Sequence, residues 1–305
     1  MSIVANASFV AVDWGTTNLR AAVLDESGVV LDRRATDQGM GCLAKEDFEP
    51  ALVALLGDLL SDARPLPVIC SGMVGSRQGW HEAPYATAPC RAPTGEDAVR
   101  VPVQDQRLAV WIVPGVKQTK PSDVMRGEET QIAGFLSRFP KFDGVLCLPG
   151  THTKWVRISA EEIVNFQTFL TGELFSLLAE QSVLRHSVAT DALDLVSFAD
   201  AVSDAMARPQ ALAAKLFTIR ADSLISDLTE EAARGRLSGY LLGLELAASR
   251  PYWLGMDVAL IGDPKLCALY QEALSAQGCP ARSHDAAGMT VEGLSAAYQS
   301  IKEIV

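Results

Sequence analysis

The stretch FVAVDWGTTNLRAAVLDESGVVLD, residues 9–32, decides the fold class because it places two strand-like runs around a small polar insert. The apolar runs are residues 9–12 and 21–24, and a third run follows the turn DESG at 25–28. Between the first two runs stand the residues DWGTTNLR, although a tight hairpin turn needs only about two residues of this kind. The extra polar residues therefore require an explanation beyond chain reversal.

The insert has the composition of a site for phosphate and a metal ion. Asp13 ends the first strand, and Gly15 permits a tight turn that residues with a Cβ atom resist. Thr16, Thr17 and Asn18 then present hydroxyl groups and backbone amides to a common concavity, which suits phosphate oxygens. A carboxylate at the strand end suits Mg²⁺ held through water. We interpret the insert as a phosphate-binding turn, with an ordinary hairpin turn as the alternative.

The pattern recurs at GVLCLPGTHTKWVRI, residues 144–158. Gly150, Thr151 and Thr153 follow another apolar strand, and Lys154 is placed to meet a phosphate or simply to flank a strand. Neither a G-x-x-x-x-G-K-[ST] motif nor a G-x-G-x-x-G motif after a strand is present. We take the recurrence as an internal repeat that starts a second domain near residue 140. Two such turns are expected to grip one polyphosphate.

Periodicity and turn residues predict alternating strands and helices. A helix is expected after Asp47 as N-cap, and another from Ser122 or Asp123 with Gly127 as a weak point inside it. Predicted strands are 9–13, 20–25, 28–34, 67–70, 110–113, one on each side of the polar turn within 144–158, 163–169 and 258–262. Further helices are expected at 172–180, 191–206, 209–218, 234–248, 264–276 and 290–303.

Composition excludes several classes of protein. The chain has 305 residues and a formal net charge of −11, which argues against binding to nucleic acid or to an anionic membrane. The six cysteines show no C-x-x-C spacing and the four histidines are scattered, so we expect reduced thiols and no zinc site. Neither a signal peptide nor a transmembrane segment is evident. A cytoplasmic protein is expected.

Six segments resemble a known family. AVDWGTTNLR and LPGTHTKWV resemble the two phosphate motifs of the actin, sugar-kinase and heat-shock-chaperone ATPase superfamily. Together with these, SGMVGSRQGW, APYATAPC, MRGEETQ and FLTGEL resemble the 2-dehydro-3-deoxygalactonokinase family over about residues 9–175. The superfamily's adenosine site has two adjacent glycines after a strand, whereas this chain has LIGDPKL, in which Asp263 follows Gly262.

The resemblance implies an α/β fold of two actin-like (ribonuclease-H-like) domains, with mixed sheets flanked by helices. The first domain would span 1–138, hold the sugar acid and the first phosphate motif, and be completed by a helix at 290–305. The second would span 139–289 and hold the second motif and the adenosine site. The implied reaction transfers the γ-phosphate of ATP, with Mg²⁺, to the terminal C6 hydroxyl of 2-dehydro-3-deoxy-galactonate in galactonate catabolism.

Phosphoryl transfer requires charge neutralisation and a carboxylate that accepts the proton of the attacking hydroxyl. In RGEETQIAG, the acid pair resembles in placement the acidic residue that opens a helix in related carbohydrate kinases, so Glu128 is the first candidate base and Asp123 the second. A solvated acid near a helix start is the alternative for Glu128. Glu129 is expected to be structural, and Asp13 to be the Mg²⁺ ligand.

The segment SGMVGSRQGW matches the place where carbohydrate kinases hold sugar hydroxyls. Gly72 and Gly75 would let the backbone approach the substrate, and Arg77 would pair with its carboxylate unless it is a surface arginine. Arg20 and Arg126 compete with Arg77 for that task. The partners expected are thus a small sugar acid and ATP, and a homodimer is one option for the assembly.

Three rival functions stay open at this point. The chain could phosphorylate another sugar or an amino sugar, since phosphate motifs do not select the acceptor. It could be an actin-like or chaperone-like ATPase, although 305 residues leave little room for added subdomains. It could also be a phosphatase of the same superfamily, which would release phosphate without a sugar acid.

Overall fold

The computed structural model describes residues 6–304, which divide into two compact units. Unit 1 comprises Met1–Phe142, Ile158–Asn165 and Ala286–Val305, and unit 2 comprises Asp143–Arg157 and Phe166–Asp285. The chain therefore leaves unit 1 near residue 142, re-enters it over residues 158–165, and returns to it again at residue 286.

Unit 1 is built on a mixed sheet of six strands. Its strand order is β3-β2-β1-β4-β8-β7. The bounds are β1 (Phe9–Trp14), β2 (Leu19–Leu24), β3 (Val30–Thr36), β4 (Leu66–Ser71), β7 (Val99–Val101) and β8 (Leu108–Ile112). Strands β1, β4 and β8 run parallel, and the other pairs are antiparallel. The register pairs Asp13 with Arg20 on one side and with Ser71 on the other.

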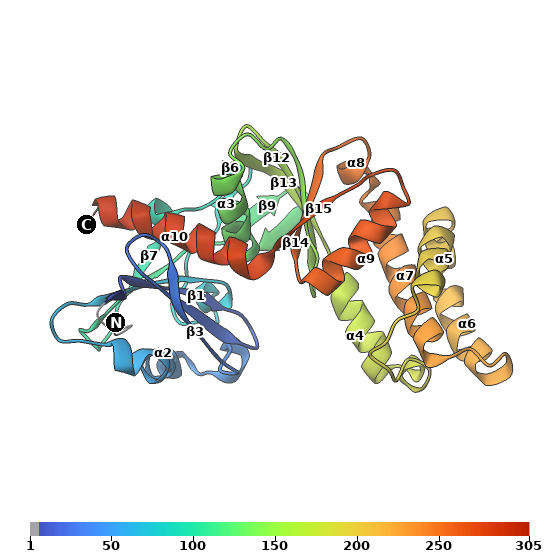
Figure 1. Ribbon diagram of the computed structural model, residues 1–305, viewed down its shortest axis with the longest axis horizontal. Helices are drawn as coiled ribbons and strands as arrows, with labels where there is room; N and C mark the ends of the chain where they lie inside the picture. Colours follow the sequence, from blue (N-terminus) through green and yellow to red (C-terminus); the bar gives the residue numbers. More distant parts are fainter. Residues whose placement is uncertain (1–5, 305) are drawn as a thin grey trace. The chain divides into compact units, whose positions relative to one another are not determined.

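Helices cover both faces of this sheet. Helix α2 (Phe48–Leu56) packs on the face that carries Trp14, where Trp14, Phe48 and Trp80 form an aromatic cluster. Helix α10 (Ala286–Ile304) crosses the opposite face (Figure 1). There Tyr298 stacks on Phe9 with ring centroids 4.0 Å apart. Helix α3 (Glu128–Arg138) packs against α10. Asp13 lies on the α10 side of the sheet, because it alternates with the residues that face α2.

The helix expected from residue 122 begins later than predicted. Residues 122 and 123 instead belong to β10 (Ser122–Met125), which pairs antiparallel with β9 (Val116–Thr119) beside the short strand β5 (Ala86–Thr87). Gly127 has a φ of 109°, a conformation that lies outside the helix and favours glycine, so α3 starts only at Glu128. The prediction of a helix cap at Ser122 or Asp123 was wrong, because this segment forms a hairpin that precedes a glycine-marked helix start.

The sheet of unit 2 contains parallel strands at its centre. Strands β11 (Gly144–Leu148), β14 (Val258–Gly262) and β15 (Arg282–Asp285) run parallel, and β12 (Thr153–Ser159) and β13 (Glu162–Phe169) follow β11 in the order of the sheet. The part of β13 that belongs to unit 1 pairs with β6 (Cys90–Arg91), which belongs to unit 1 as well. Helix α9 (Pro264–Ser275) follows β14, and Trp155 and Trp253 are buried in the core. Both units thus carry mixed α/β layers, as the sequence predicts.

The rest of unit 2 is helical. Its bounds are α4 (Thr171–Gln181), α5 (Leu195–Ala207), α6 (Leu212–Ile225), α7 (Glu230–Ala248) and α8 (Arg250–Trp253). Helices α5, α6 and α7 run side by side in Figure 1. Gly235, Gly239 and Gly243 lie at helical spacing on the side of α7 that meets α5, where added Cβ atoms would clash with the α5 segment. The close approach of these two helices therefore depends on glycine.

Several predicted boundaries shift for local reasons. Helix α5 begins at Leu195 rather than 191 because the Asp194 carboxylate accepts the amide of Ser197 as an N-cap. Thr229 caps α7 four residues earlier than predicted, through the amide of Ala232. Asp47 does occupy the position before α2, but its carboxylate accepts the amide of Ala44 instead of capping the helix.

Candidate functional site

The turn after β1 is fixed by a second backbone segment, residues 39–41. Met40 donates its amide to the carbonyl of Gly15 at 2.9 Å, and Gly41 donates to that of Thr16 at 2.8 Å. Gly39 donates to the carbonyl of Thr17 at 3.2 Å. Thr16 and Thr17 are exposed, and among residues 6–304 no protein group accepts a hydrogen bond from their amides. The carbonyls are thus occupied while the donors stay available, which suits an anion.

Two carboxylates lie close to this turn. The Arg20 guanidinium is 3.5 Å from an Asp13 carboxylate oxygen, and 36% of the Asp13 side chain is exposed. Desolvation raises the pKa of Asp13; Arg20 opposes this effect and the nearby charge of Glu128 adds to it. Asp13 and Glu128 therefore act on one another electrostatically, although they come from β1 and the start of α3. The structure brings together the residue proposed for the metal and the first candidate base.

Two glycines let these segments approach. Gly72 has a φ of 92°, and an added Cβ would lie 2.8 Å from the carbonyl oxygen of Trp14 and 3.6 Å from the Asp13 carboxylate. A Cβ on Gly127 would lie 3.5 Å from the Cα atom of Gly72. The ends of β1 and β4 and the start of α3 consequently meet at backbone distance.

Glu129 is fully buried behind this cluster. The amide of Gly127 donates to both carboxylate oxygens of Glu129, at 2.9 and 2.7 Å, and the amide of Arg126 donates to Glu128 at 3.0 Å. Burial, with a smaller contribution from the charge of Glu128, raises the pKa of Glu129 to about 8. Glu129 thus shapes the backbone turn that orients Glu128, which agrees with the structural role expected of it.

The candidate arginines occupy different surroundings. Arg77 has 83% of its side chain exposed and lies 3.7 Å from Glu82. Arg126 stacks on Tyr85 with its guanidinium carbon 4.2 Å from the ring centroid, and its Nη2 donates to the carbonyl of Ala83 at 2.9 Å. The Arg126 Nη1 is buried near Gly75, whose Cβ would lie 2.8 Å from it.

Three buried polar groups near the end of β4 lack a hydrogen-bond partner in the described part of the chain. They are Arg126 Nη1 and the hydroxyls of Ser71 and Ser76. Buried polar groups are almost always paired, so unpaired ones call for water or a polar ligand. The segment Ser71–Ser76 therefore carries unpaired hydrogen-bonding groups, and its role in binding sugar hydroxyls stays a prediction.

Asp123 stands apart from the helix start that the sequence suggested for it. It lies on β10 opposite Gln118, and its carboxylate accepts the amide of Val124 at 2.8 Å. The β-hairpin and Gly127 separate it along the chain from Glu128. The structure consequently gives the two candidate bases different local settings.

The oxygen donors at Asp13 suit Mg²⁺. Magnesium keeps several waters and is usually held by one or two carboxylates together with substrate phosphates. A partly exposed Asp13 with Glu128 beside it offers such a set. Within residues 6–304 no group of three or more His, Cys, Asp and Glu side chains could by itself hold a metal ion. The fit therefore relies on phosphate as a further ligand.

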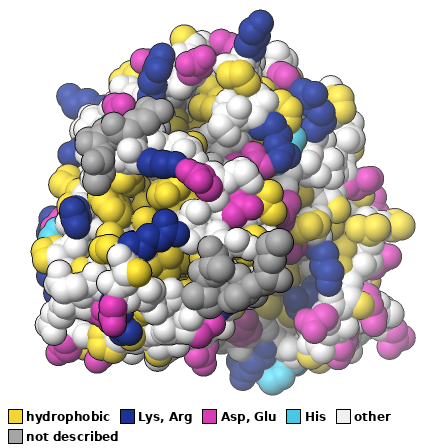
Figure 2. Space-filling model, turned by 60° about the vertical axis from the view of Figure 1, so that its left-hand side comes forward, with side chains coloured by type: hydrophobic (Ala, Val, Ile, Leu, Met, Phe, Trp, Pro, Cys, Tyr) yellow, Lys and Arg dark blue, Asp and Glu magenta, His cyan; other side chains and the backbone are white. Residues whose placement is uncertain are grey.

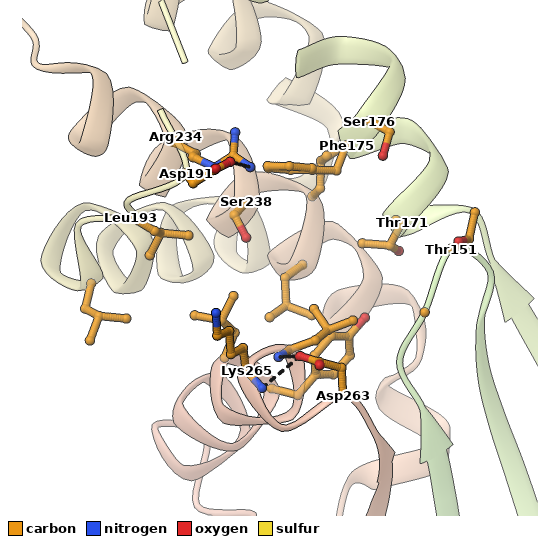
Figure 3. Close-up of a pocket in the computed structure, with 18 residues that line it drawn as sticks. Thr151, Thr171, Phe175, Ser176, Asp191, Leu193, Arg234, Ser238, Asp263 and Lys265 are labelled. Atoms are coloured by element: carbon orange, nitrogen blue, oxygen red, sulfur yellow. Dashed lines mark hydrogen bonds and ion pairs between the residues drawn. The ribbon is translucent and has the colours of Figure 1, made fainter. Parts of the chain in front are cut away.

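Unit 2 contains a pocket of about 670 Å³. It opens where β11 and β14 end, which is the usual place for ligands in parallel sheets. In Figure 3, Thr151 and Thr171 lie on one side, Asp263 and Lys265 below, and Ser238, Asp191 and Arg234 opposite. Arg234 lies over the Phe175 ring at 5.0 Å from its centroid. The walls are mainly apolar, with these few polar groups at the edges.

The second turn borders this pocket. Gly150 and Thr151 line it, and the amide of Glu173 in α4 donates to the carbonyl of Thr151 at 2.9 Å. Thr153 and Lys154 are buried instead: the Thr153 hydroxyl bonds to that of Tyr270 at 2.9 Å, and Lys154 Nζ donates to the carbonyl of His152 at 3.0 Å. Only part of the predicted turn therefore reaches the pocket.

Gly262 lies at the end of β14 and packs against Pro149, with an added Cβ 3.3 Å from the Pro149 carbonyl oxygen. Asp263 stands where the family resemblance led us to expect a second glycine. Its carboxylate accepts the amides of Lys265 and Leu266 at 2.9 and 3.1 Å, and so caps α9. The first amides of α9, at the pocket edge, are therefore occupied by the Asp263 carboxylate. A second glycine at this position would leave these amides without a side-chain acceptor.

Sequence reasoning missed residues that support both sites. Residues 39–41 carry no polar signal, and Glu245, Tyr270 and Arg234 lie in a region read only as helices. Of these residues, only Glu245 gives a signal in the sequence, because it is a glutamate inside the apolar face of a helix.

On the face shown in Figure 2, basic side chains are scattered among acidic and apolar ones. None of the described helices has the length and apolar character needed to cross a membrane.

Comparison with known proteins gives consistent matches over nearly the whole chain. The family model described as 2-keto-3-deoxy-galactonokinase matches residues 13–297. A Rhizobium meliloti protein named as a probable 2-dehydro-3-deoxygalactonokinase is 39% identical over 300 residues, covering 96% of this chain and 97% of the relative. The Escherichia coli 2-dehydro-3-deoxygalactonokinase is 35% identical over 279 residues, covering 90% and 91%.

A solved structure matches at the level of the fold and the sequence. The crystal structure of a Sinorhizobium meliloti protein, described as a 2-dehydro-3-deoxygalactonokinase, has a TM-score of 0.89 and 38% identity. The match covers 96% of this chain and 99% of that one. It confirms the fold class that the sequence predicts.

Proposed function

Because the chain belongs to the 2-keto-3-deoxy-galactonokinase family, we propose that it transfers the γ-phosphate of ATP to the C6 hydroxyl of 2-dehydro-3-deoxy-galactonate. The observation that carries the proposal is the pair Asp13 and Glu128, which lies beside a turn with available backbone amides. Phosphoryl transfer needs this combination of anion binding, metal binding and proton acceptance.

Glu128 is the proposed proton acceptor. The attacking hydroxyl oxygen bonds to the γ-phosphorus while the bond to the bridging oxygen of ADP breaks, and the proton passes to the Glu128 carboxylate. The amide of Arg126, which donates to Glu128, and the Gly127 turn held by Glu129 fix its orientation. Asp123, on its own strand, is the second candidate base.

Asp13 is the proposed ligand of Mg²⁺, which when bound neutralises charge on the phosphate oxygens. Gly15, Thr16, Thr17 and Asn18 would bind phosphate with amides and hydroxyls. Arg20 favours the ionised form of Asp13 through its ion pair and so opposes the rise in pKa that desolvation causes. The negative charge of the phosphates would therefore be neutralised in part by the metal ion and the turn amides of unit 1.

Unit 2 is the proposed nucleotide-binding unit. Gly150 and Thr151 would contact phosphate, and the pocket that extends to Asp263, the residue after Gly262, would hold the nucleoside. Its mainly apolar walls suit a flat base, while its polar edge groups suit a ribose and base nitrogens. Thr153 and Lys154 are buried, so we assign them the support of the turn rather than direct phosphate contact.

The sugar acid is proposed to bind at the end of β4 in unit 1. Gly72 and Gly75 bring the backbone close to a ligand, and the unpaired hydroxyl of Ser71 could accept and donate hydrogen bonds there. Arg77 and the unpaired Nη1 of Arg126 are the proposed partners of the substrate carboxylate. A charged acid would be selected over a neutral sugar by this pair.

An ATP-coupled assay across a panel of substrates tests the proposal. The panel contains 2-keto-3-deoxy sugar acids that differ in configuration, other sugar acids, neutral sugars and an amino sugar. We expect ADP formation that depends on 2-dehydro-3-deoxy-galactonate and Mg²⁺, and a phosphomonoester at C6 by NMR. Equal ADP formation without any acceptor, or preference for a neutral sugar, would contradict the proposal.

A further inference from the structure

Glu245 is a carboxylate buried inside unit 2, on the apolar side of α7, with only 1% of its surface exposed. Three side chains donate hydrogen bonds to it. Trp155 Nε1 donates at 2.8 Å, the Tyr270 hydroxyl at 2.9 Å, and the Thr171 hydroxyl donates to the same oxygen as Tyr270. These donors come from β12, α9 and α4, so one carboxylate joins four elements of unit 2.

These bonds have a fixed direction as long as the Glu245 carboxylate is ionised. An ionised carboxylate only accepts, so the Tyr270 hydroxyl must point its proton at Glu245. The Thr153 hydroxyl, 2.9 Å from the Tyr270 oxygen, must then donate to Tyr270. Burial raises the pKa of Glu245, whereas the bonds from Thr171, Trp155 and Tyr270 favour the charged form. The carboxylate thereby sets the orientation of a short chain of hydroxyl groups.

The network reaches the second turn from both ends. Thr153 and Trp155 follow that turn directly on β12. Thr171 begins α4, and an added Cβ on its neighbour Gly172 would lie 2.3 Å from the Gly150 carbonyl oxygen. Thr171 and Tyr270 also line the pocket. Movement of the Glu245 carboxylate would consequently shift the turn, the start of α4 and the pocket wall together.

We propose that Glu245 is a positioning residue for nucleotide binding, acting through Thr171, Tyr270 and Trp155 on the Gly150–Thr151 turn. The inference rests on the proposed function, because it requires that ATP binds at this pocket. A purely structural role, in which the carboxylate only holds the core together, is the competing explanation. The positioning role predicts that a change in the orientation of these hydrogen bonds weakens the binding of ATP but not that of the sugar acid. The purely structural role predicts no such selectivity.

Glu245→Gln separates these explanations. It keeps the shape of the side chain, but it reverses the direction of the hydrogen bonds with Thr171 and Tyr270. Trp155 only donates, so the amide oxygen must face Trp155 and the amide nitrogen must face the hydroxyls of Thr171 and Tyr270. Tyr270 would then accept from the amide nitrogen, and its own proton would have to turn to the Thr153 oxygen, which reverses the Thr153–Tyr270 bond. The pocket-lining hydroxyls are expected to reorient while the packing is kept.

The test measures ATP dissociation constants directly, and KM for both substrates, in the full chain. For Glu245→Gln we expect a roughly tenfold weaker binding of ATP, a similar rise in its KM, and less than about a twofold change for the sugar acid. Glu230→Gln, an exposed acid on the same helix, is the matched control and should leave both values unchanged. Melting temperature and circular dichroism establish that the variants are folded.

Tyr270→Phe extends the test without removing the carboxylate. If Glu245 acts through Tyr270, the effects of the two changes on ATP binding should be clearly non-additive in the double variant. Unchanged ATP binding in Glu245→Gln, or equal losses for both substrates with a lowered melting temperature, would overturn the inference. A wild-type chain that binds no ATP would instead refute the proposed function, and this inference with it.

Discussion

The turn after β1 is held by backbone hydrogen bonds, whereas the turn after β11 is held by buried side chains. In unit 1, the amides of residues 39–41 occupy the turn carbonyls, and the threonine side chains stay exposed. In unit 2, Thr153 and Trp155 point into the core and end on the buried carboxylate of Glu245. The same sequence pattern is therefore held in place by backbone hydrogen bonds in unit 1 and by buried side-chain hydrogen bonds in unit 2.

The difference matters for chemistry, because each turn has its acids in a different place. Beside the first turn, Asp13 and Glu128 lie at the partly exposed end of the sheet, where they can meet substrate or metal. Beside the second, Glu245 is enclosed and satisfied by three donors. We expect unit 1 to determine the rate of transfer and unit 2 to determine nucleotide affinity.

Glu128→Gln should have the largest effect and tests this division. Removing the proton acceptor while keeping the shape should lower kcat by roughly a hundredfold to ten-thousandfold, with little change in ATP binding. Rapid-quench kinetics and equilibrium ATP binding measure the two quantities. Asp123→Asn is the matched comparison and should retain most of the activity. Loss of chemistry in Asp123→Asn with near-normal Glu128→Gln would move the base to Asp123.

Gly39→Ala should break the support of the first turn through the backbone alone. Its Cβ would lie 2.2 Å from the carbonyl carbon of Thr17, so the turn or residues 39–41 must move. Overpacking of this kind costs about 1–3 kcal/mol, and we expect kcat/KM to fall by roughly tenfold or more. Gly57→Ala is the matched control, since nothing lies within 4 Å of its Cβ and its φ is −54°.

Gly172→Ala is the counterpart in unit 2, where the added Cβ would meet the Gly150 carbonyl oxygen at 2.3 Å. If the two turns serve different ends, this change should weaken ATP binding, whereas Gly39→Ala should act mainly on kcat. Steady-state kinetics with direct ATP titration distinguishes the two. Identical changes in kcat and in ATP binding for both variants would contradict the proposal that unit 1 determines the rate and unit 2 the nucleotide affinity.

The contrast also shows what could be predicted from sequence. Strands β1, β2 and β11 and both turns were predictable because apolar runs and small polar residues alternate locally. Glu245 was not, because its partner Trp155 lies 90 positions away and only the tertiary fold joins them. The helix was predicted to start at residue 122, but this segment forms strand β10 between Pro121 and Gly127. Its pairing with β9 outweighs the local sequence signals for a helix. The sites themselves were named residue by residue, and their roles stay predictions.

The two buried acids offer a further comparison, through stability. Glu129 accepts one backbone amide and a Thr130 hydroxyl at 3.3 Å, whereas Glu245 has three side-chain donors. The pKa of Glu129 is raised to about 8, so the folded chain binds a proton that the unfolded chain releases at lower pH. That contribution is present at low pH and is lost as the pH rises towards 8.

Glu129→Gln should remove this dependence. Between about pH 5 and pH 8, the wild-type free energy of unfolding should fall relative to that of the variant, by up to about 1.4 kcal/mol per pH unit. Denaturant unfolding at several pH values measures the difference, in which groups common to both chains cancel. A constant difference across this range would show that Glu129 does not change its protonation state there.

The smallest effect is expected from Arg20→Gln, which probes the exposed side of the first site. Arg20 favours the charged form of Asp13, so its removal should raise the pKa of Asp13 further above the ordinary value. If ionised Asp13 holds the metal, the acid limb of the kcat/KM profile must then move to higher pH. The shift is small because 59% of the Arg20 side chain is exposed, and exposed ion pairs contribute only about 0.2–1 kcal/mol. Arg33→Gln, an exposed arginine on β3 that is paired in register with Ala22, is the matched control and should leave the profile unchanged. A profile that moves to lower pH, or equally in both variants, would mean that Arg20 contacts substrate rather than tuning Asp13, and the assignment of the first turn to metal and phosphate would have to be revised.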